Sequence, residues 1–306
     1  MLSCSICKSK VKPLYSLGNF HYFFCSDCNA LFLHPKPSEK VIKQYYKSQF
    51  EYTAGKKNEN RIRKRARIII TKLKKLNPTG KKLLDVGSGF GYFLDEAKKC
   101  DLDVTGIEPS KNLHSISINR LIDTNIIYSS FENFYKRNQG VKFDFISLIH
   151  VIEHIPNPKD FIRMASKMLN KNGILYIETP NFDSWLAKVE KENYTFLTPP
   201  DHIWIFSIKL LQLIIVACPE LYLQSYSSYS YSEHFMGIMK KLVPRHPKGV
   251  QDTNLDIDLK LKTENFKFIR KKLTYYLFDK IIAPVCTLFL NIGGYGSILE
   301  LYIKKK

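Results

Sequence analysis

The 306-residue sequence contains no uninterrupted apolar run of the ~18 residues that a membrane-spanning helix needs. The nearest candidates are residues 203–218, which Lys209 and Gln212 interrupt, and the shorter run 281–292, which includes Pro284. The N-terminus also lacks the basic segment followed by an apolar segment that marks a secretory signal. We therefore expect a cytoplasmic protein without a spanning helix.

Acidic residues are too few to balance the basic ones: 28 Asp and Glu stand against 47 Lys and Arg, for a net charge of +19. Hydrophobic residues make up 44% and charged residues 25% of the chain, which excludes a disordered chain. The basic excess is local, because residues 56–82 hold 12 Lys and Arg against Glu59 alone. We expect a solvated basic surface there; the alternative is a surface for phosphate, nucleic acid or a membrane.

Residues 61–76, within this basic segment, carry apolar side chains at intervals of 4, 3, 4 and 3 residues. This spacing places them on one face of an α-helix. The apolar residues are Ile62, Ala66, Ile69, Leu73 and Leu76. The sequence thus predicts a helix with one apolar face and a second face rich in Lys and Arg.

Four of the seven cysteines form two Cys-x-x-Cys pairs, Cys4 with Cys7 and Cys25 with Cys28, with 17 residues between the pairs. Each pair fits a tight turn that points two thiolates at one place, and two such turns complete the four-sulfur tetrahedron that suits Zn²⁺. The protein fills all four positions, so we expect a structural metal. Residues 1–35 are then a zinc ribbon, because so short a segment needs a metal to hold it together.

The remainder of the chain alternates predicted strands with predicted helices. Strands are expected at 82–86, 103–107, 126–128, 143–149, 174–178, 221–227 and 298–303. Helices are expected at 39–47, 92–99, 160–169, where Asn172-Gly173 marks the stop, and 207–217. The alternation indicates an α/β fold with a doubly wound, mostly parallel sheet.

A glycine-rich turn, residues 85–91 (Asp-Val-Gly-Ser-Gly-Phe-Gly), follows the first of these strands. It lacks the dinucleotide fingerprint, whose third glycine would fall at Tyr92. The carboxylate of Asp85 would repel a pyrophosphate and instead suits a cationic ligand without phosphate. Glu108 ends the next strand, where an acidic residue can hold the hydroxyls of a ribose.

The motif at 85–91, with Gly-Ile-Glu-Pro-Ser at 106–110, resembles class I S-adenosylmethionine-dependent methyltransferases. Residues 143–158 and 169–181 are similar to the branch that contains ubiquinone-type and sugar or cell-envelope methyltransferases, some with an N-terminal zinc ribbon. The resemblance covers roughly residues 80–240. It implies a seven-stranded sheet, with S-adenosylmethionine as the cofactor beside the structural Zn²⁺.

The resemblance also assigns roles by position. Gly87, Ser88, Gly89 and Phe90 would line the methionine moiety, Asp85 would lie near its amino group and Glu108 would hold the ribose. Ser130 and Phe131 would border the adenine, and His150 would flank the methyl-bearing sulfur. The full predicted cofactor site is Asp85, Gly87, Ser88, Gly89, Phe90, Gly91, Glu108, Ser130, Phe131 and His150.

The protein's task in methyl transfer is to place an acceptor in line with the activated methyl group and to exclude water. A hydroxyl acceptor also needs a base, and histidine has a useful pKa for it. The predicted catalytic candidates are His150, His154 and His202. Each has a plainer interpretation: His150 packs on the cofactor, His154 anchors its loop, and His202 is a structural loop residue.

We expect three parts: a zinc ribbon at 1–35, a linker with the basic helix at 36–79, and a methyltransferase domain at 80–306 with an insertion at about 236–294. The predicted acceptor is a small molecule, a sugar, nucleotide sugar or glycan-linked cell-envelope precursor, possibly phosphate-bearing. One alternative is an RNA methyltransferase that uses the ribbon and the basic helix. A second is a non-catalytic adaptor. Residues 281–290 would permit peripheral membrane contact. The sequence does not fix the oligomeric state.

Overall fold

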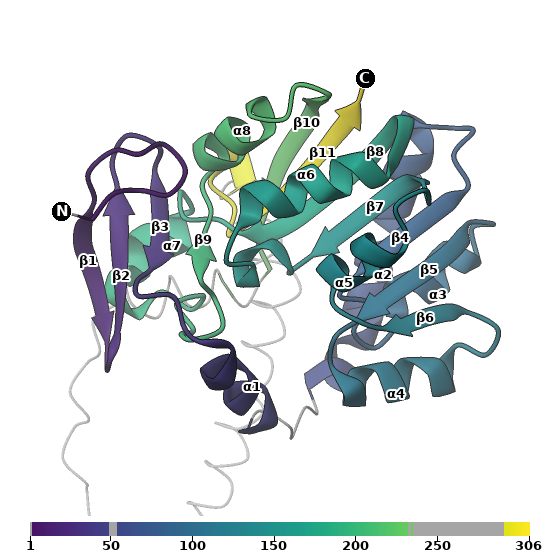
Figure 1. The fold of residues 1–306 in the computed structure, drawn as a ribbon, viewed down its shortest axis with the longest axis horizontal. Coiled ribbons are helices and arrows are strands. Elements are labelled where there is room, and N and C mark those ends of the chain that lie inside the picture. Colours follow the sequence, from purple (N-terminus) through teal and green to yellow (C-terminus); the bar gives the residue numbers. More distant parts are fainter. Residues whose placement is uncertain (1, 49–53, 232–233, 235–290) are drawn as a thin grey trace, which may run out of the picture. The chain divides into compact units, whose positions relative to one another are not determined.

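The computed structural model describes residues 2–48, 54–231, 234 and 291–306 (Figure 1). The chain divides into two compact units. The first contains residues 1–182, 196–227 and 299–306, and the second contains residues 183–195 and 228–298.

The main sheet of the first unit has seven strands in the order β10-β11-β8-β7-β4-β5-β6. Their bounds are β4 Lys82–Val86, β5 Asp103–Glu108, β6 Asn125–Tyr128, β7 Phe143–Ile149, β8 Leu169–Pro180, β10 Leu221–Tyr229 and β11 Ile298–Lys305. The pairs β4·β5, β4·β7, β5·β6 and β7·β8 are parallel. The strand order reverses at β4, and such a point is where a ligand binds beyond the carboxyl ends of the strands.

Successive residues of the central strands face opposite sides of this sheet, so two apolar clusters form. On one side Leu83 and Phe145 pack with helix α2 (Ala54–Leu76) and α3 (Tyr92–Lys98). On the other side Leu84 and Ile146 pack with α6 (Pro158–Met168) and α8 (Ile208–Val216). The sheet carries α4 (Lys111–Arg120) and α5 (Phe131–Arg137) as well, and Ser110 and Ser130 are their N-caps. The predicted α/β class is confirmed.

Helix α2 is longer than its apolar pattern indicated, because it begins at Ala54 and not at residue 61. Ala66, Ile69 and Leu73 are buried as predicted, and Ile70 joins them. Ile62 is 37% exposed and lies outside the core. The polar first turns have no apolar periodicity, so the sequence pattern could not locate the start.

Strand β8 also exceeds its prediction, since it runs through Asn172 and Gly173, which were expected to separate a helix from the strand. The pairing of β7 with β8 shifts register between Phe143 and Phe145. Asn172 has a positive φ of 62°, which Asn tolerates better than most residues. The two residues therefore form an irregularity within the strand.

A second, four-stranded sheet joins β1 (Lys12–Leu17), β2 (Phe20–Cys25), β3 (Ala30–Leu33) and β9 (Trp204–Ile205), in that order (Figure 1). All three pairings are antiparallel. The cysteine-bearing strands thus take their fourth strand from a segment about 170 residues further along the chain. Helix α1 (Glu39–Ser48) follows β3.

The second unit contains α7 (Trp185–Glu190) and the short turns η2 (Lys191–Asn193) and η4 (Ile292–Gly294). Within it Lys188 Nζ lies 5.0 Å from the ring centre of Trp185 and 4.1 Å from that of Tyr295. Most of the predicted insertion at 236–294, and the run 281–290, lie outside the described residues. No helix in the described part of the chain has the length and hydropathy to cross a membrane. The predicted domain boundaries stay a prediction.

Candidate active site

The glycine turn after β4 bends back onto the end of β5. The amides of Gly87 and Ser88 donate to the carbonyl of Ile107 at 2.8 and 3.0 Å. Gly87, Gly89 and Gly91 all have positive φ, a conformation in which glycine is unstrained. A β-carbon at Gly89 would meet nothing closer than 4.0 Å, so the backbone there is open to a ligand.

Glu108 is buried beside this turn, and both of its carboxylate oxygens are fixed. Oε2 accepts a hydrogen bond from the amide of Gly89 and Oε1 one from the amide of Ser110, each at 2.8 Å. Burial raises the pKa of Glu108 above its usual range. A carboxylate has about four acceptor positions, so two remain for hydroxyl donors.

Asp85, on β4, is the second buried carboxylate beside the glycine turn. Its Oδ1 accepts a hydrogen bond of 2.6 Å from Ser147 Oγ on the neighbouring strand β7. Burial raises the pKa of Asp85 to about 7, against the effect of the Ser147 hydrogen bond. A cation bound beside it would favour the ionised form.

Two observations fit an adenosyl ligand at this edge. Ser88 Oγ is buried without a hydrogen-bond partner among the described groups, so a donor or acceptor is missing there. A hollow of about 310 Å³ follows Glu108 and is lined by Pro109, Tyr128, Ser129 and Ser130, among others. Ser130, predicted with Phe131 to border the adenine, lines this hollow, whereas Phe131 is not among its lining residues. It is buried in the core, with its ring 4.8 Å from that of Phe161.

The three predicted catalytic histidines gather around one buried carboxylate, Glu153, in the turn η1 (Ile152–His154). We name His150, Glu153, His154 and His202 the histidine cluster. His150 Nδ1 lies 3.2 Å from Glu153 Oε1, and His150 Nε2 lies 3.6 Å from Glu178 Oε1 at the end of β8. Thr179 Oγ1 donates to Glu153 Oε2 at 2.9 Å.

His150 stands out by its backbone as well, with a φ of 52° that a non-glycine residue rarely adopts. Its amide donates to the carbonyl of Glu178 at 2.9 Å. Burial opposes its charge, but the hydrogen bond to Glu153 and the charges of Glu153 and Glu178 raise the pKa of His150 above 6.5. Burial would raise the pKa of Glu153, but His150 and the charge of His154 lower it to about 2.

The pKa values of His154 and His202 shift in opposite directions although their ring centres are 4.9 Å apart. His154 Nδ1 lies 2.9 Å from Asp201 Oδ1, and despite burial this pairing raises the pKa of His154 to about 9. Burial lowers the pKa of His202. His202 Nδ1 lies 2.8 Å from the carbonyl of Phe196, which only accepts, so Nδ1 carries the proton and Nε2 the lone pair.

Two groups of side chains are close enough to hold a metal ion. The four sulfurs of Cys4, Cys7, Cys25 and Cys28 lie within 4.8 Å of one another, with Cys4–Cys28 at 3.6 Å and Cys7–Cys25 at 3.4 Å. A tetrahedral site with Zn–S bonds of about 2.3 Å needs separations of roughly 3.8 Å, so the group fits Zn²⁺. Contact with the Cys28 thiol lowers the pKa of Cys4 to about 5.

The second group is Glu153, His154 and His202, whose ligand atoms also lie within 4.8 Å. His154 is paired with Asp201 and holds its proton up to a pKa of about 9. A cation here would have to displace that proton. We therefore treat this group as a hydrogen-bonded histidine cluster.

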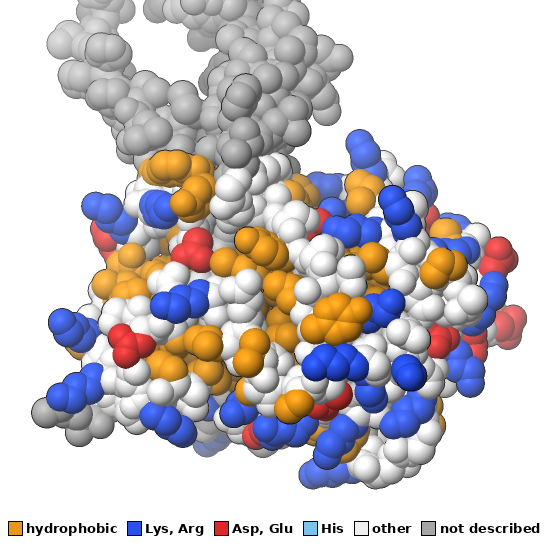
Figure 2. Space-filling view, turned by 90° about the horizontal axis from the view of Figure 1, so that it is seen from above, with side chains coloured by type: hydrophobic (Ala, Val, Ile, Leu, Met, Phe, Trp, Pro, Cys, Tyr) orange, Lys and Arg blue, Asp and Glu red, His pale blue; other side chains and the backbone are white. Residues whose placement is uncertain are grey.

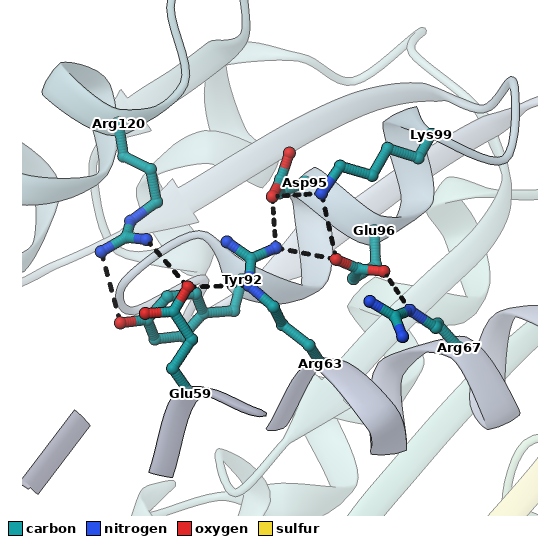
Figure 3. Close-up of polar contacts among 8 residues, drawn as sticks. All are labelled: Glu59, Arg63, Arg67, Tyr92, Asp95, Glu96, Lys99 and Arg120. Carbon is teal, nitrogen blue, oxygen red and sulfur yellow. Dashed lines mark hydrogen bonds and ion pairs between the residues drawn. The ribbon is translucent and has the colours of Figure 1, made fainter. Parts of the chain in front are cut away.

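The basic side chains of α2 turn toward carboxylates and not only to solvent. Arg63 contacts Glu59, Asp95 and Glu96, while Arg67 Nε donates to Glu96 Oε2 at 2.6 Å (Figure 3). The expected solvated surface is thus partly an ion-pair network that fastens α2 to α3. On the face drawn in Figure 2, Lys and Arg side chains are scattered among uncharged ones and form no single patch.

The ion-pair network between α2 and α3 also contacts Tyr92, the residue that follows the glycine turn. The guanidinium carbons of Arg63 and Arg120 lie 5.1 and 4.3 Å from the ring centre of Tyr92 (Figure 3). Phe90 stacks on Tyr92 with ring centres 5.7 Å apart. The network therefore supports the glycine turn from the side of α2.

Several hydrogen-bond partners of the predicted site residues do not follow from the sequence. Ser147 and Asp201 lie 62 and 47 residues from the groups they contact, Asp85 and His154. No spacing rule joins positions so far apart. For Glu153 a signal was present, since it directly precedes His154, but its position at the centre of the cluster depends on the tertiary fold.

The seven-stranded order and the glycine turn are those of a class I S-adenosylmethionine-dependent methyltransferase, as predicted. A family model described as a methyltransferase domain matches residues 58–215, about half of the chain. The chain therefore belongs to the methyltransferase-domain family.

Curated relatives match less than half of the chain. The mitochondrial ubiquinone biosynthesis O-methyltransferase of Dictyostelium discoideum is 30% identical over 147 residues, 42% of this chain and 46% of that protein. The ubiquinone biosynthesis O-methyltransferase of Glaesserella parasuis is 32% identical over 109 residues, 33% of this chain and 46% of that protein. The chain thus spans about half the length of these relatives.

Solved structures confirm the fold. A SAM-dependent methyltransferase from Archaeoglobus fulgidus superposes with a TM-score of 0.54 at 17% identity, covering 84% of this chain and all of that one. The plantazolicin methyltransferase BamL, in complex with a triazolic desmethylPZN analog and SAH, has a TM-score of 0.53 at 14% identity; the match covers 86% of this chain and 91% of that one. At such identities the likeness concerns the fold alone.

Proposed function

We propose that this protein transfers the methyl group of S-adenosylmethionine to a hydroxyl of a small-molecule acceptor. The cofactor, when bound, supplies an already activated methyl group. The observation that carries the proposal is the pair of buried carboxylates, Asp85 and Glu108, on either side of an open glycine turn. Glu108 would hold the ribose hydroxyls, Asp85 the amino group, and Ser88 would gain the polar partner that it lacks.

His150 is the general base in this proposal. It stands at the end of β7, next to the strand of Asp85. With Nδ1–H directed at Glu153, its Nε2 carries the lone pair that accepts the hydroxyl proton. The imidazolium that forms is then stabilised by Glu153 and Glu178. His154 is a poor base because its pairing with Asp201 keeps it protonated at neutral pH.

The acceptor class follows from two lines of support. The curated relatives are named O-methyltransferases, which favours a hydroxyl as the accepting group. The sequence motifs favour a sugar, nucleotide sugar or glycan-linked precursor. The ion pairs of Arg63, Arg65 and Arg67 weigh against the RNA alternative, because carboxylates already neutralise these side chains. We also propose that the four cysteines hold Zn²⁺.

The test separates binding from transfer. S-adenosylhomocysteine should bind by calorimetry and raise the melting temperature. Radiolabelled methyl from S-adenosylmethionine should then enter a member of a panel of nucleotide sugars, glycolipid precursors and the phenolic probe 3,4-dihydroxybenzoate. His150→Gln should bind S-adenosylhomocysteine and transfer no label. Absence of S-adenosylhomocysteine binding would refute the proposal, and a fully active His150→Gln would refute the base.

A further inference from the structure

The cysteine-bearing sheet touches the segment that carries His202. Tyr22 on β2 is fully buried, and its hydroxyl donates a hydrogen bond of 2.6 Å to the carbonyl of His202. The amide of Leu33 on β3 donates to the carbonyl of Ile203 at 2.8 Å. Burial raises the pKa of Tyr22, so its hydroxyl stays a donor at neutral pH.

The contacts continue from this segment to the centre of the histidine cluster. The amide of Ile203 donates to the carbonyl of Glu153 at 2.9 Å. A second connection leaves the end of the cysteine-bearing segment, where Lys36 Nζ donates to the carbonyl of Pro156 at 2.5 Å and to Asn157 Oδ1 at 3.0 Å. The segments on both sides of Glu153 are therefore held by the cysteine-bearing sheet and by Lys36, which lies three residues beyond β3.

The four cysteines lie where they can fix the strands that make these contacts. Cys25 is the last residue of β2, and Cys28 stands two residues before β3. Phe32 and Trp204 are register partners of β3 and β9, with ring centres 5.1 Å apart. A metal at the four sulfurs would hold β2 and β3 in the register that β9 needs.

We propose that the cysteine-bearing sheet is the scaffold of the histidine cluster and that Tyr22 is a positioning residue for His202 and Glu153. The inference rests on the proposed function, in which the cluster serves methyl transfer. We name Asp85, the glycine turn and Glu108 the cofactor edge. In this inference the cofactor edge does not depend on the ribbon, whereas the histidine cluster does. Tyr22 itself is fully buried and acts through its hydrogen bond to the carbonyl of His202.

The experiment uses the full-length, zinc-loaded protein and its Tyr22→Phe variant, which removes one hydroxyl and keeps the ring. Hydrogen exchange followed by mass spectrometry should show roughly three- to tenfold faster exchange in residues 198–206, the range expected for one lost hydrogen bond. Residues 85–108 should exchange as in the wild type. The ¹⁵N signals of the His202 imidazole should lose the signature of a fixed Nδ1–H tautomer.

Kinetics give a second measurement. A general loss of stability would not lower kcat while leaving cofactor binding unchanged. In Tyr22→Phe we expect kcat with the best acceptor of the panel to fall about tenfold, while the KM for S-adenosylmethionine and the affinity for S-adenosylhomocysteine stay within twofold. Tyr302→Phe is the matched control. Tyr302 is also a fully buried tyrosine, but its hydroxyl has no hydrogen-bond partner among the described residues.

A second variant tests the role of a metal at the four cysteines. Cys28→Ser should lower bound zinc, measured by plasma mass spectrometry, and speed exchange in residues 198–206 more than Tyr22→Phe does, with S-adenosylhomocysteine still bound. If Cys28→Ser does not fold, Tyr22→Phe alone decides. Exchange at 198–206 and kcat no different from Tyr302→Phe would overturn the inference. Failure of the wild type to bind S-adenosylhomocysteine would instead overturn the proposed function, and the exchange result would still stand.

Discussion

The cofactor edge and the histidine cluster are assembled in different ways. At the cofactor edge, Glu108 is fixed by the amides of Gly89 and Ser110, which lie within 19 residues of it. In the cluster, Glu153 contacts His150, which follows β7, and Thr179 at the end of β8. It also contacts the segment around His202, to which Tyr22 donates a hydrogen bond although the two residues are 180 positions apart in the sequence. A local backbone turn therefore defines one site, and the joining of two sheets defines the other.

The largest effect is expected from Glu153→Gln, which keeps the shape of the side chain and removes its charge. The buried carboxylate fixes His150 and balances the charge of His154, so kcat should fall by 10²- to 10⁴-fold. The affinity for S-adenosylhomocysteine should stay within about threefold, measured by calorimetry. Glu132→Gln on α5 is the control. A comparable loss of cofactor affinity would show that the two regions are not independent.

The converse variant is Glu108→Gln at the cofactor edge. Replacing one carboxylate oxygen by an amide group turns an acceptor of ribose hydroxyls and backbone amides into a donor. We expect the affinity for S-adenosylhomocysteine to fall by about one to three orders of magnitude, or roughly 1–4 kcal/mol. Exchange of residues 198–206 should not change. An unaltered affinity would remove Glu108 from the binding site.

This contrast explains what the sequence could and could not predict. Asp85, the glycines and Glu108 follow from a strand, a turn and the next strand, so their meeting is a local consequence of the α/β order. His150 could be placed because it follows a buried parallel strand. These positions need only the sheet order.

The other partners need the complete tertiary fold. Nothing in the sequence pairs β9 with the cysteine-bearing strands or brings Tyr22 to His202. The basic pattern of α2 predicted its buried face, but it could not show that Arg63 turns toward Asp95 and Glu96. Charge partners in different elements leave no periodic signal, unlike apolar residues that share one helix face.

The ion pairs of α2 offer a smaller test of how the cofactor edge is supported. Arg63 is 16% exposed and contacts three carboxylates, whereas Arg67 is 63% exposed and contacts Glu96. Arg63→Met should lower the free energy of unfolding by about 2 kcal/mol, and Arg67→Met should lower it clearly less, since exposed ion pairs contribute little. Urea unfolding measures both. Equal losses would contradict the role given to burial.

A pH dependence is also expected at the cofactor edge. Burial holds the pKa of Asp85 at about 7 in the free protein, and a bound ammonium group would favour the ionised form. Below pH 7 binding must therefore remove a proton from Asp85, so the affinity for S-adenosylhomocysteine should fall up to tenfold per pH unit between pH 7 and 5.5, and level off above pH 8. Calorimetry of the wild type and Asp85→Asn over this range provides the test. The amide of Asp85→Asn cannot ionise, so the affinity of this variant for S-adenosylhomocysteine should be weaker and should not change with pH over this range. A pH dependence that persists in Asp85→Asn would assign the proton to another group, such as Glu108, whose pKa burial also raises.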